Sequence, residues 1–281
     1  LVPVPESLVN AQSIEPFLHE LNERTFAKYN AFTVGEVLNE TDEELHFFIG
    51  KDGVFSSIFD FKQTMLGQEG KGWFDHSLPT ADELKESIFQ AHERADSIGV
   101  LSTIIENHDE PRGVSHYIAE GPVNDTSKKA LGTIQVLRKG IPFIYQGQEI
   151  GMENQVFESV EDFDDIATIN GYHVAKEAGL SEEEALAVIA NYSRDNARTP
   201  MQWSAEPGLG FSDGPAWLIS PKPDYSINVE DQEKDPDSIL NYYRQLTALY
   251  RHPLYGNTIR FGDMIPAYRD RENIIAFERR G

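Results

Sequence analysis

The chain contains no cysteine among its 281 residues. Disulfide bonds and metal sites built on thiolates are therefore excluded. No apolar run approaches the ~20 residues that a membrane-spanning helix needs. The first ten residues, LVPVPESLVN, contain no basic stretch before an apolar one and no initiator Met, so we expect neither a signal peptide nor a natural start there. We expect an excerpt of a longer cytoplasmic chain that has no membrane partner.

Positive charge is scarce. Lys and Arg total 24 against 47 Asp and Glu, which gives a formal net charge of −23. A chain this acidic repels the phosphates of nucleic acids and of anionic lipids, so neither is an expected partner. The hydrophobic content of 40% and the charged content of 25% are ordinary for a globular protein. The length is enough for one large domain or two medium ones.

Several motifs of known chemistry are also missing. The sequence has no glycine-rich phosphate loop, no histidines at metal-ligand spacing and no G-x-S-x-G nucleophile elbow. We therefore expect no cofactor and no metal ion. Phosphoryl transfer, metal-assisted hydrolysis and serine-hydrolase chemistry become poor candidates for the same reason.

Helical and strand patterns alternate along the first half of the sequence. Apolar periodicity predicts helices at 13–30, 80–99 and 125–140, and short buried strands at 31–37, 54–61, 100–105 and 141–151. Alternation of this kind predicts parallel βα units, in an open sheet or a barrel. Beyond 151, the pattern predicts a helical insertion to about 217, a helix at 235–253 and two final strands around a turn. Thr80 with Glu83, and Ser181 with Glu184, predict capping boxes.

Two carboxylates stand where predicted strands end. Glu36 lies at the end of the strand 31–37, and Asp109 follows the strand 100–105 within ENHDEPR. In a βα barrel, reactive residues gather at the carboxyl ends of the strands, so we expect these two acids to meet on neighbouring strand ends. Taken singly, each acid is more often a rim or turn residue, His108 a satisfied histidine and Arg194 a structural arginine. Only their combination indicates a site.

The combination suits the cleavage of glycosidic bonds. That reaction needs one proton donor and one negative charge beside an oxocarbenium-like centre. Imidazole and guanidinium groups donate hydrogen bonds to sugar hydroxyls, and aromatic rings offer apolar faces. The aromatic candidates are Phe59, Phe61, Tyr145 and Trp203. Carbohydrate hydrolysis therefore fits this residue set best.

Four segments, TVGEV, ENHDEPR, PFIYQGQEIGM and SRDNARTPMQW, together resemble the α-amylase superfamily of glycoside hydrolases. Within it they are similar to the oligo-1,6-glucosidase, dextran-glucosidase and α-glucosidase branch, to which the last of these motifs, a long one, is specific. The resemblance runs along essentially the whole chain. It implies an α/β fold in which residues 1–151 form strands five to eight of a (β/α)8 TIM barrel. Residues 152–217 would be an insertion after strand eight, 218–262 the last barrel helix region, and 263–281 the start of a C-terminal β domain.

The resemblance also implies roles for single residues. Glu36 matches the general acid/base, and Asp109 matches the carboxylate that binds ring hydroxyls and stabilises the transition state. His108 matches the histidine that binds the sugar in the −1 subsite, and Arg194 the arginine that holds the 4-hydroxyl of the terminal sugar in exo-acting enzymes. Glu110 stands where the family lines the +1 side. Because Glu36 must carry a proton near neutral pH, we expect it to be partly buried beside other carboxylates.

One part of the family pattern is missing. The nucleophile belongs to a G-F-R-x-D motif, and neither this motif nor the upstream D-x-V-x-N-H segment occurs in the chain. Retention requires that nucleophile ~5–5.5 Å from the acid. We therefore expect this chain to be inactive alone, with the missing N-terminal half of the barrel as its partner. Its two unpaired strand edges would invite self-association.

The activity implied for the parent protein is that of a retaining, exo-acting α-glucosidase. The substrates would be α-1,6 or α-1,4 bonds of short oligosaccharides such as isomaltose. A sucrose isomerase and a trehalose-6-phosphate hydrolase share much of this framework. A non-catalytic amylase-like binding protein, and an open α/β protein with an unrelated small ligand, are further alternatives.

Overall fold

A computed structural model describes residues 14–281, except 69, 119–120, 219 and 223. Its main sheet has four strands in the order β1-β2-β3-β4, and each strand pairs in parallel with the next. The strands are β1 (Val34–Gly35), β2 (Ser57–Phe59), β3 (Leu101–Thr103) and β4 (Ile141–Pro142). The prediction of an α/β fold with parallel βα units is confirmed. Each strand lies inside its predicted range but is shorter, because the apolar runs continue beyond the residues that pair.

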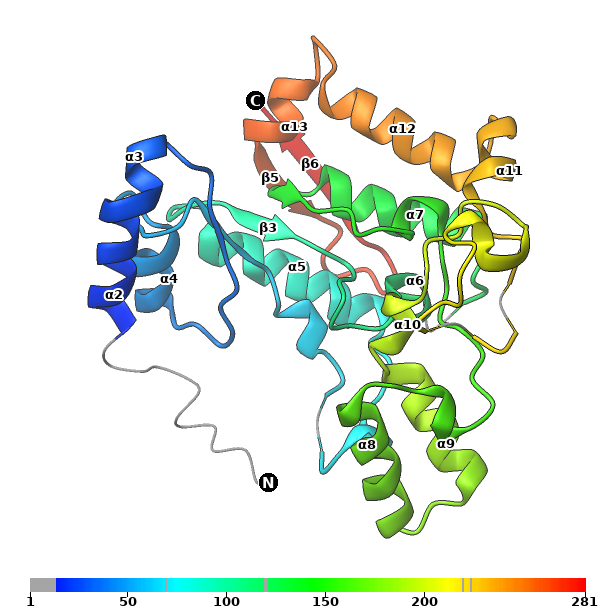
Figure 1. The fold of residues 1–281 in the computed structure, drawn as a ribbon. Helices are drawn as coiled ribbons and strands as arrows, with labels where there is room; N and C mark the ends of the chain where they lie inside the picture. The colour runs from blue at the N-terminus through cyan, green and yellow to red at the C-terminus, as the bar shows by residue number, and fades with distance from the viewer. Residues whose placement is uncertain (1–13, 69, 119–120, 219, 223) are drawn as a thin grey trace.

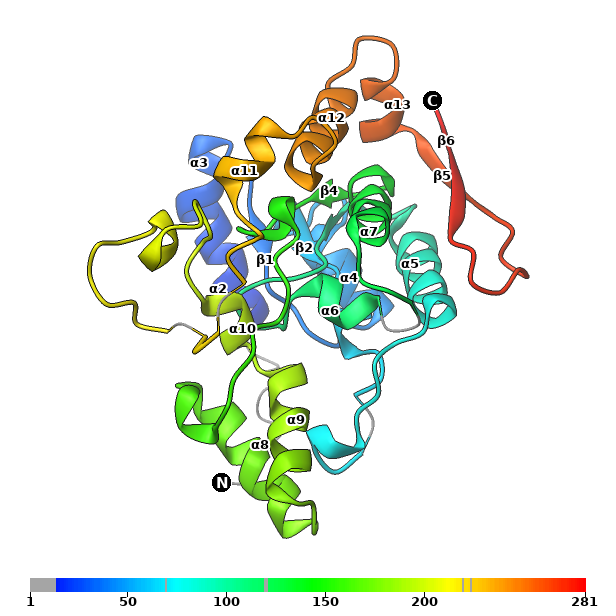
Figure 2. The same cartoon turned by 90° about the vertical axis from the view of Figure 1, so that its right-hand side faces the viewer.

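Helices connect the strands and cover the sheet. α2 (Ile14–Leu21), a π-helical segment (Asn22–Phe26) and α3 (Ala27–Tyr29) follow one another before β1. α5 (Ala81–Ala95) precedes β3, and α7 (Asp125–Leu137) precedes β4. Figure 2 shows β1, β2 and β4 near the centre of the molecule, with α4, α5 and α7 around them. These helices confirm three of the predicted ones, apart from residue 13, which lies outside the described residues.

The sequence patterns missed α4 (Asp42–Ile49), which lies between β1 and β2. A complete capping box begins it: the Thr41 hydroxyl accepts the Glu44 N–H, and the Glu44 carboxylate accepts the Thr41 N–H. Leu45 and Ile49 pack from this helix against Ile58 of β2. The apolar stripe of α4 is only two turns long, which is too short for a clear helical period.

The largest apolar cluster lies where α5 meets β3 and α7. Leu84, Ile88 and Phe89 of α5 pack with Ile105, which follows β3, and with Leu131 of α7. The cluster also contains Val114, Tyr117 and Met264. The helix α5 thus buries one face against the strand that leads to Asp109, and this packing fixes the position of the end of that strand.

The second half of the chain is mainly helical. α6 (Gly113–Tyr117) precedes α7, and α8 (Ile166–Glu177) and α9 (Glu182–Tyr192) pack together and project from the body in both views (Figures 1 and 2). α10 (Asp195–Arg198) follows them. The capping box predicted at Ser181 and Glu184 is present at the start of α9. Short 3-10 turns occur at Gln63–Met65, Trp73–Asp75, Gln148–Ile150, Val160–Asp162 and Pro207–Gly210.

The helix predicted at 235–253 is present but starts later and ends earlier, and a separate helix that was not predicted precedes its range. α11 (Val229–Lys234) ends before Asp235, and α12 (Ile239–Tyr250) begins after it, with α13 (Gly256–Phe261) next. Pro236 explains the break between α11 and α12, since proline disfavours a helical residue before it. The tail forms the antiparallel pair β5 (Asp263–Ala267) and β6 (Ala276–Arg280), as predicted.

The domain boundaries at 151, 217 and 262 stay predictions, and residues 1–13 of the first domain lie outside the described part. Within the described ranges, no helix has both the length and the apolarity needed to span a membrane.

Candidate functional site

A pocket lies beyond the carboxyl ends of the strands. It encloses roughly 610 Å³, including the part that is open to solvent. Glu36 comes to it from the end of β1, and His108 and Asp109 come from the segment that follows β3. The other lining residues are Phe59, Phe61, Ile104, Glu106, Asn107, Phe143, Ile144 and Tyr145. Carboxylates, an imidazole and several aromatic rings therefore share one hollow.

We expected the two acids to stand on neighbouring strands, but they do not. β2 lies between β1 and β3 in the sheet. Phe59 ends β2, and its ring packs against Phe61 and against Phe143, at centroid separations of 5.7 and 5.0 Å. The end of β2, with its aromatic side chains, therefore lies between the strand that leads to Glu36 and the strand that leads to Asp109. Trp203 is not among the described lining residues.

The Asp109 carboxylate is held by three basic side chains. Its Oδ1 lies 2.9 Å from Nη1 of Arg194 and 2.7 Å from Nη2 of Arg198, and its Oδ2 lies 3.2 Å from Nε2 of His108. The Asp109 backbone N–H donates to Oδ1 of Asn107 at 2.7 Å, which closes a tight turn. Because Asp109 keeps 39% of its side chain exposed, this charge also faces the open pocket.

Arg194 has a second, buried partner. Its Nε and Nη2 lie 2.8 and 2.6 Å from Oδ1 of Asp165, whose side chain is 2% exposed. Although burial opposes it, the hydrogen bonds from Arg194 and Thr168 hold the pKa of Asp165 below its usual value. Arg194 therefore bridges a buried anion and the pocket anion.

Sequence reasoning missed two residues of this site, Arg198, which binds Asp109, and Asp165, which binds Arg194. Arg198 stands inside the motif SRDNARTPMQW, four residues after Arg194, and that spacing places both on one face of a helix. This signal was available, although it did not show which carboxylate the two arginines share. Nothing local marks Asp165, because it meets Arg194 only through the folded insertion.

A buried ion pair lies next to the turn that contains Asp109. Arg112 and Glu106 are 0% and 1% exposed, and Nη1 of Arg112 lies 3.0 Å from Oε1 of Glu106. The same nitrogen donates to the Gln146 carbonyl at 2.7 Å, and the Gly113 N–H donates to Oε2 of Glu106 at 2.6 Å. The pair thus joins the segment after β3 to the segment after β4.

Glu110 lies apart from the pocket lining. It is only partly exposed, and the Thr64 side chain lies beside it. Burial, reinforced by the charge of Asp109, raises the pKa of Glu110 to about 7. The place of Glu110 on the +1 side of a substrate stays a prediction. Its position apart from the pocket lining does not support that prediction.

Glu36 is exposed in this chain. The expected partial burial is therefore not found here. Gly35 before it is buried, and a Cβ at that position would lie 2.6 Å from the ring of Phe55, so only glycine fits beneath Glu36. The carboxyl group consequently stands free at the end of β1.

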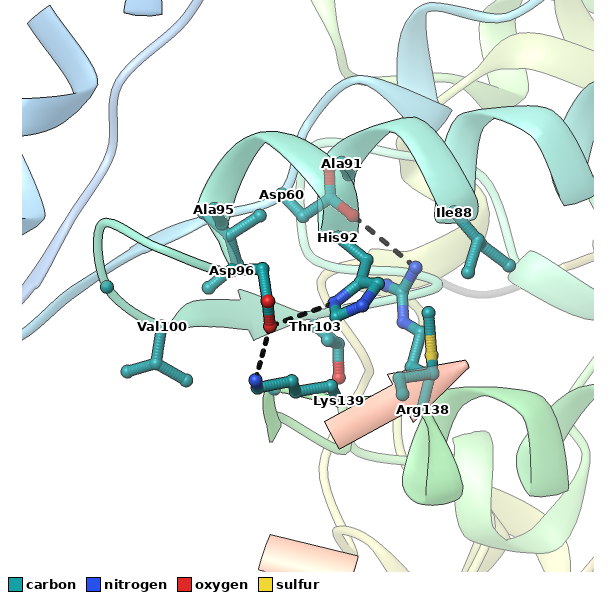
Figure 3. Close-up of a pocket in the computed structure, with 14 residues that line it drawn as sticks. Asp60, Ile88, Ala91, His92, Ala95, Asp96, Val100, Thr103, Arg138 and Lys139 are labelled. Atoms are coloured by element: carbon teal, nitrogen blue, oxygen red, sulfur yellow. Dashed lines mark hydrogen bonds and ion pairs between the residues drawn. The ribbon is translucent and has the colours of Figure 1, made fainter. Parts of the chain in front are cut away.

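A second pocket lies near the amino-terminal ends of β3 and β4 (Figure 3). Asp96 lies 2.5 Å from Nζ of Lys139 and 3.9 Å from Nδ1 of His92, and Arg138 faces Asp60. Burial lowers the pKa of His92, although Asp96 acts in the opposite direction. The Asp96–Lys139 pair joins the end of α5 to the segment before β4, and the Arg138–Asp60 pair joins that segment to the end of β2. None of the predicted site residues lines this pocket.

No group of three or more His, Asp or Glu side chains in the described residues could hold a metal ion. The expectations that the protein uses no metal and no cofactor stay predictions.

Comparison with known proteins identifies the family of this chain. The family model "Alpha amylase, catalytic domain" matches residues 5–254. Probable oligo-1,6-glucosidase 2 of Bacillus subtilis is 38% identical over 243 residues, covering 85% of this chain and 43% of that protein.

Solved structures match as well. A mutant trehalose-6-phosphate hydrolase of Bacillus licheniformis in complex with PNG superposes with a TM-score of 0.87 at 31% identity, covering 95% of this chain and 48% of the other. Isomaltulose synthase from Klebsiella sp. LX3 gives a TM-score of 0.84 at 28% identity, with 92% and 47% covered. The chain spans about half the length of these relatives. It belongs to the alpha-amylase family and has that family's TIM-barrel type of fold.

Proposed function

We propose that this chain is part of a retaining, exo-acting α-glucosidase that hydrolyses α-1,6 or α-1,4 bonds of short oligosaccharides such as isomaltose. The observation that carries the proposal is that Glu36, His108 and Asp109 line one open pocket with aromatic walls. The names of several relatives support the substrate class, since they are oligo-1,6-glucosidases and a glucan 1,6-alpha-glucosidase.

In the proposed reaction Glu36 donates its proton to the glycosidic oxygen as the bond to the anomeric carbon breaks. A carboxylate outside this chain attacks that carbon and forms a covalent glycosyl intermediate. Asp109 is an anion beside the sugar ring, and its charge stabilises the oxocarbenium-like centre. Glu36, now ionised, then removes a proton from the water that releases glucose. His108 and Arg194 bind ring hydroxyls.

We also propose that β1 to β4 are strands five to eight of the barrel, and that the remaining strands belong to a longer parent protein. The apolar face of α2 supports this, because Phe17 is 66% exposed and Ile14 and Leu21 are also exposed. β1 and β4, at the ends of the sheet, have one paired edge each among the described strands. The missing half of the barrel would cover that face and pair with both edges.

We propose the cytoplasm as the location of the parent protein. Fractionation of cells that produce the parent tests this proposal.

The test compares the full-length parent with the 281-residue chain on isomaltose. We expect the parent to release glucose and the chain alone to release none. In the parent, Glu36→Gln should lower kcat by about 10²- to 10⁴-fold, since that is the usual contribution of a general acid. Glu40→Gln, an exchange at a nearby glutamate outside the pocket, is the matched control. Glucose release by the chain alone contradicts the inactive fragment, and an unchanged Glu36→Gln variant contradicts the assignment of the acid.

A trehalose-6-phosphate hydrolase is the second candidate. A protein of that name in Bacillus subtilis is 31% identical over 273 residues, which is 95% of this chain, more than the oligo-1,6-glucosidase covers. The solved synthases of isomaltulose and trehalulose keep a sucrose isomerase open too. Assays of the parent on isomaltose, trehalose 6-phosphate and sucrose separate the three. Binding of all three without turnover identifies the non-catalytic alternative.

A further inference from the structure

Arg198 contacts two consecutive residues at the end of β3. Its Nη2 lies 2.7 Å from Oδ1 of Asp109, and its Nε donates to the His108 carbonyl oxygen at 2.8 Å. One guanidinium group therefore binds both the carboxylate and the backbone of the turn that presents it. Because the group is planar and its donors are fixed in direction, these two bonds set the orientation of the turn.

Arg194 binds the same carboxylate differently. It reaches Oδ1 of Asp109 with Nη1 alone, whereas Nε and Nη2 both face Asp165. Asp165 is itself fixed, since the backbone N–H and the hydroxyl of Thr168 each donate to its Oδ2 at 2.9 Å. If Arg194 released Asp109, it would keep an ionic partner. Among the described residues, Arg198 would keep only the His108 carbonyl as a partner.

The short helix α10, which follows Arg194 and ends at Arg198, is anchored on the side facing the pocket and on the side facing the insertion. The Tyr145 hydroxyl donates to the Ala197 carbonyl at 3.0 Å, which joins α10 to the pocket wall. The side-chain amide of Asn196 donates to the Ala190 carbonyl of α9 at 2.8 Å. Figure 2 shows α10 between α9 and the strands. Arg198 therefore projects from a fixed element.

From these contacts we propose that Arg198 is a positioning residue for Asp109, while Arg194 keeps the role in binding ring hydroxyls that the proposed function gives it. The inference rests on the proposed function and extends it. Arg198 holds the His108–Asp109 turn in the free and the occupied pocket.

The kinetic test uses the full-length parent with Arg198→Met, Arg198→Lys and the matched control Arg244→Met. Arg244 is an exposed arginine of α12 whose partners are Glu233 and Asn241, none of them in the pocket. A misplacement of about 1 Å costs roughly 100-fold in rate, so Arg198→Met should lower kcat by about that factor and leave KM nearly unchanged. Arg198→Lys should recover part of the rate, because one ammonium group keeps the charge but cannot make both bonds. Arg194→Lys should instead raise KM.

A second readout does not depend on activity. Labelling with ¹³C-carbonyl histidine and ¹⁵N aspartate reports each His-Asp peptide bond, of which this sequence has one, at 108–109. Asp109→Asn identifies its signal in the parent by removing it. We expect Arg198→Met to shift that signal, since the His108 carbonyl loses a donor, and Arg244→Met to leave it in place.

The outcomes separate the two proposals. A parent that hydrolyses no α-glucoside overturns the proposed function, and the peptide signal then still decides whether Arg198 holds the turn. If Arg198→Met keeps its kcat, or loses it while the signal stays in place, the positioning role is wrong. A loss of thermal stability with unchanged kcat and signal also overturns it, because that pattern marks a purely structural arginine.

Discussion

At the scale of single residues, the ion pair of Arg112 and Glu106 is the most enclosed charge pair beside the pocket. Both side chains are almost fully buried, and Arg112 also lies 5.5 Å from the centre of the Tyr145 ring. A buried pair stabilises a fold only when its remaining donors and acceptors are satisfied. Here the Gln146 carbonyl and the Gly113 N–H supply part of those contacts, whereas Nε of Arg112 is buried without a hydrogen-bond partner among the described residues. The pair therefore fixes the pocket wall at Tyr145 relative to the turn at Asp109.

Replacing Arg112 by Met should destabilise the protein strongly. The change leaves the Glu106 carboxylate buried without its cation, and breaking a buried pair in this way costs about 3–5 kcal/mol. The double variant Arg112→Met with Glu106→Gln removes the uncompensated charge, so it should recover part of that loss. Urea denaturation of both variants and the wild-type chain measures the difference. Equal stability of the single and double variants would contradict the ionic account.

The sequence was sufficient to find the pocket acids but not their partners. Glu36 and Asp109 were predictable because each follows an apolar strand pattern, and parallel strands end on one face. Asp165 and Arg198 were not, since the first reaches Arg194 across the insertion and the second reaches Asp109 from a separate helix. Contacts between distant segments leave no local pattern. The exposure of Glu36 likewise depends on what surrounds β1.

At the scale of elements, helix starts were more predictable than helix ends or strand lengths. The capping boxes at Thr80 and Ser181 are both present, because the motif is a set of local hydrogen bonds fixed by spacing. α5 nevertheless ends at Ala95, whereas the pattern predicted a stop at Gly99. Its last contacts are set by packing with neighbouring elements, as the buried Ala91 and Ala95 indicate.

The cap of α5 makes an element-scale prediction. The Glu83 N–H donates to the Thr80 hydroxyl at 3.2 Å, and the Thr80 N–H donates to the Glu83 carboxylate at 2.7 Å. Thr80→Ala removes the first bond and should lower the free energy of unfolding by about 1 kcal/mol. Thr80→Ser keeps the hydroxyl and serves as the control. Chemical denaturation monitored by circular dichroism compares them, and equal midpoints for Ala and Ser would show that the cap contributes nothing.

The same cap responds to pH. Hydrogen bonds from the backbone and hydroxyl of Thr80 hold the pKa of Glu83 below its ordinary value. A carboxyl group with a depressed pKa stabilises the folded state above its unfolded pKa, and this contribution is lost as the pH falls through the folded pKa. Thr80→Ala keeps the backbone bond and removes the hydroxyl's share of this effect, so the difference between Thr80→Ala and wild type should shrink as the pH falls below about 4.3. The denaturation series used for the cap, repeated at pH 7 and pH 4, measures that change.

At the scale of the whole molecule, the α8–α9 pair is attached to the body through a group of aromatic rings. Tyr192, the last residue of α9, packs against Trp73, His76 and His116, with ring centroids 6.4, 5.4 and 6.4 Å away. Both ring nitrogens of His116 are buried without a hydrogen-bond partner. Burial lowers the pKa of His116 to about 4, and burial also lowers the pKa of His76. The two histidines in this group of rings therefore resist protonation in the folded protein.

This attachment should weaken in acid. A histidine whose folded pKa lies below its unfolded value of about 6.5 binds protons more readily in the unfolded state, so stability falls as the pH decreases from about 6.5 to 4. For His116 the full loss is about 3 kcal/mol at most. His116→Phe removes this titration, and the exposed His173→Phe on α8 is its control. Urea denaturation at pH 7, 6, 5 and 4.5 should show the wild-type chain losing stability relative to His116→Phe at each step, while His173→Phe follows the wild type. A constant difference across that range would mean that His116 is hydrated or paired in solution, and that the rings around Tyr192 do not couple the insertion to pH.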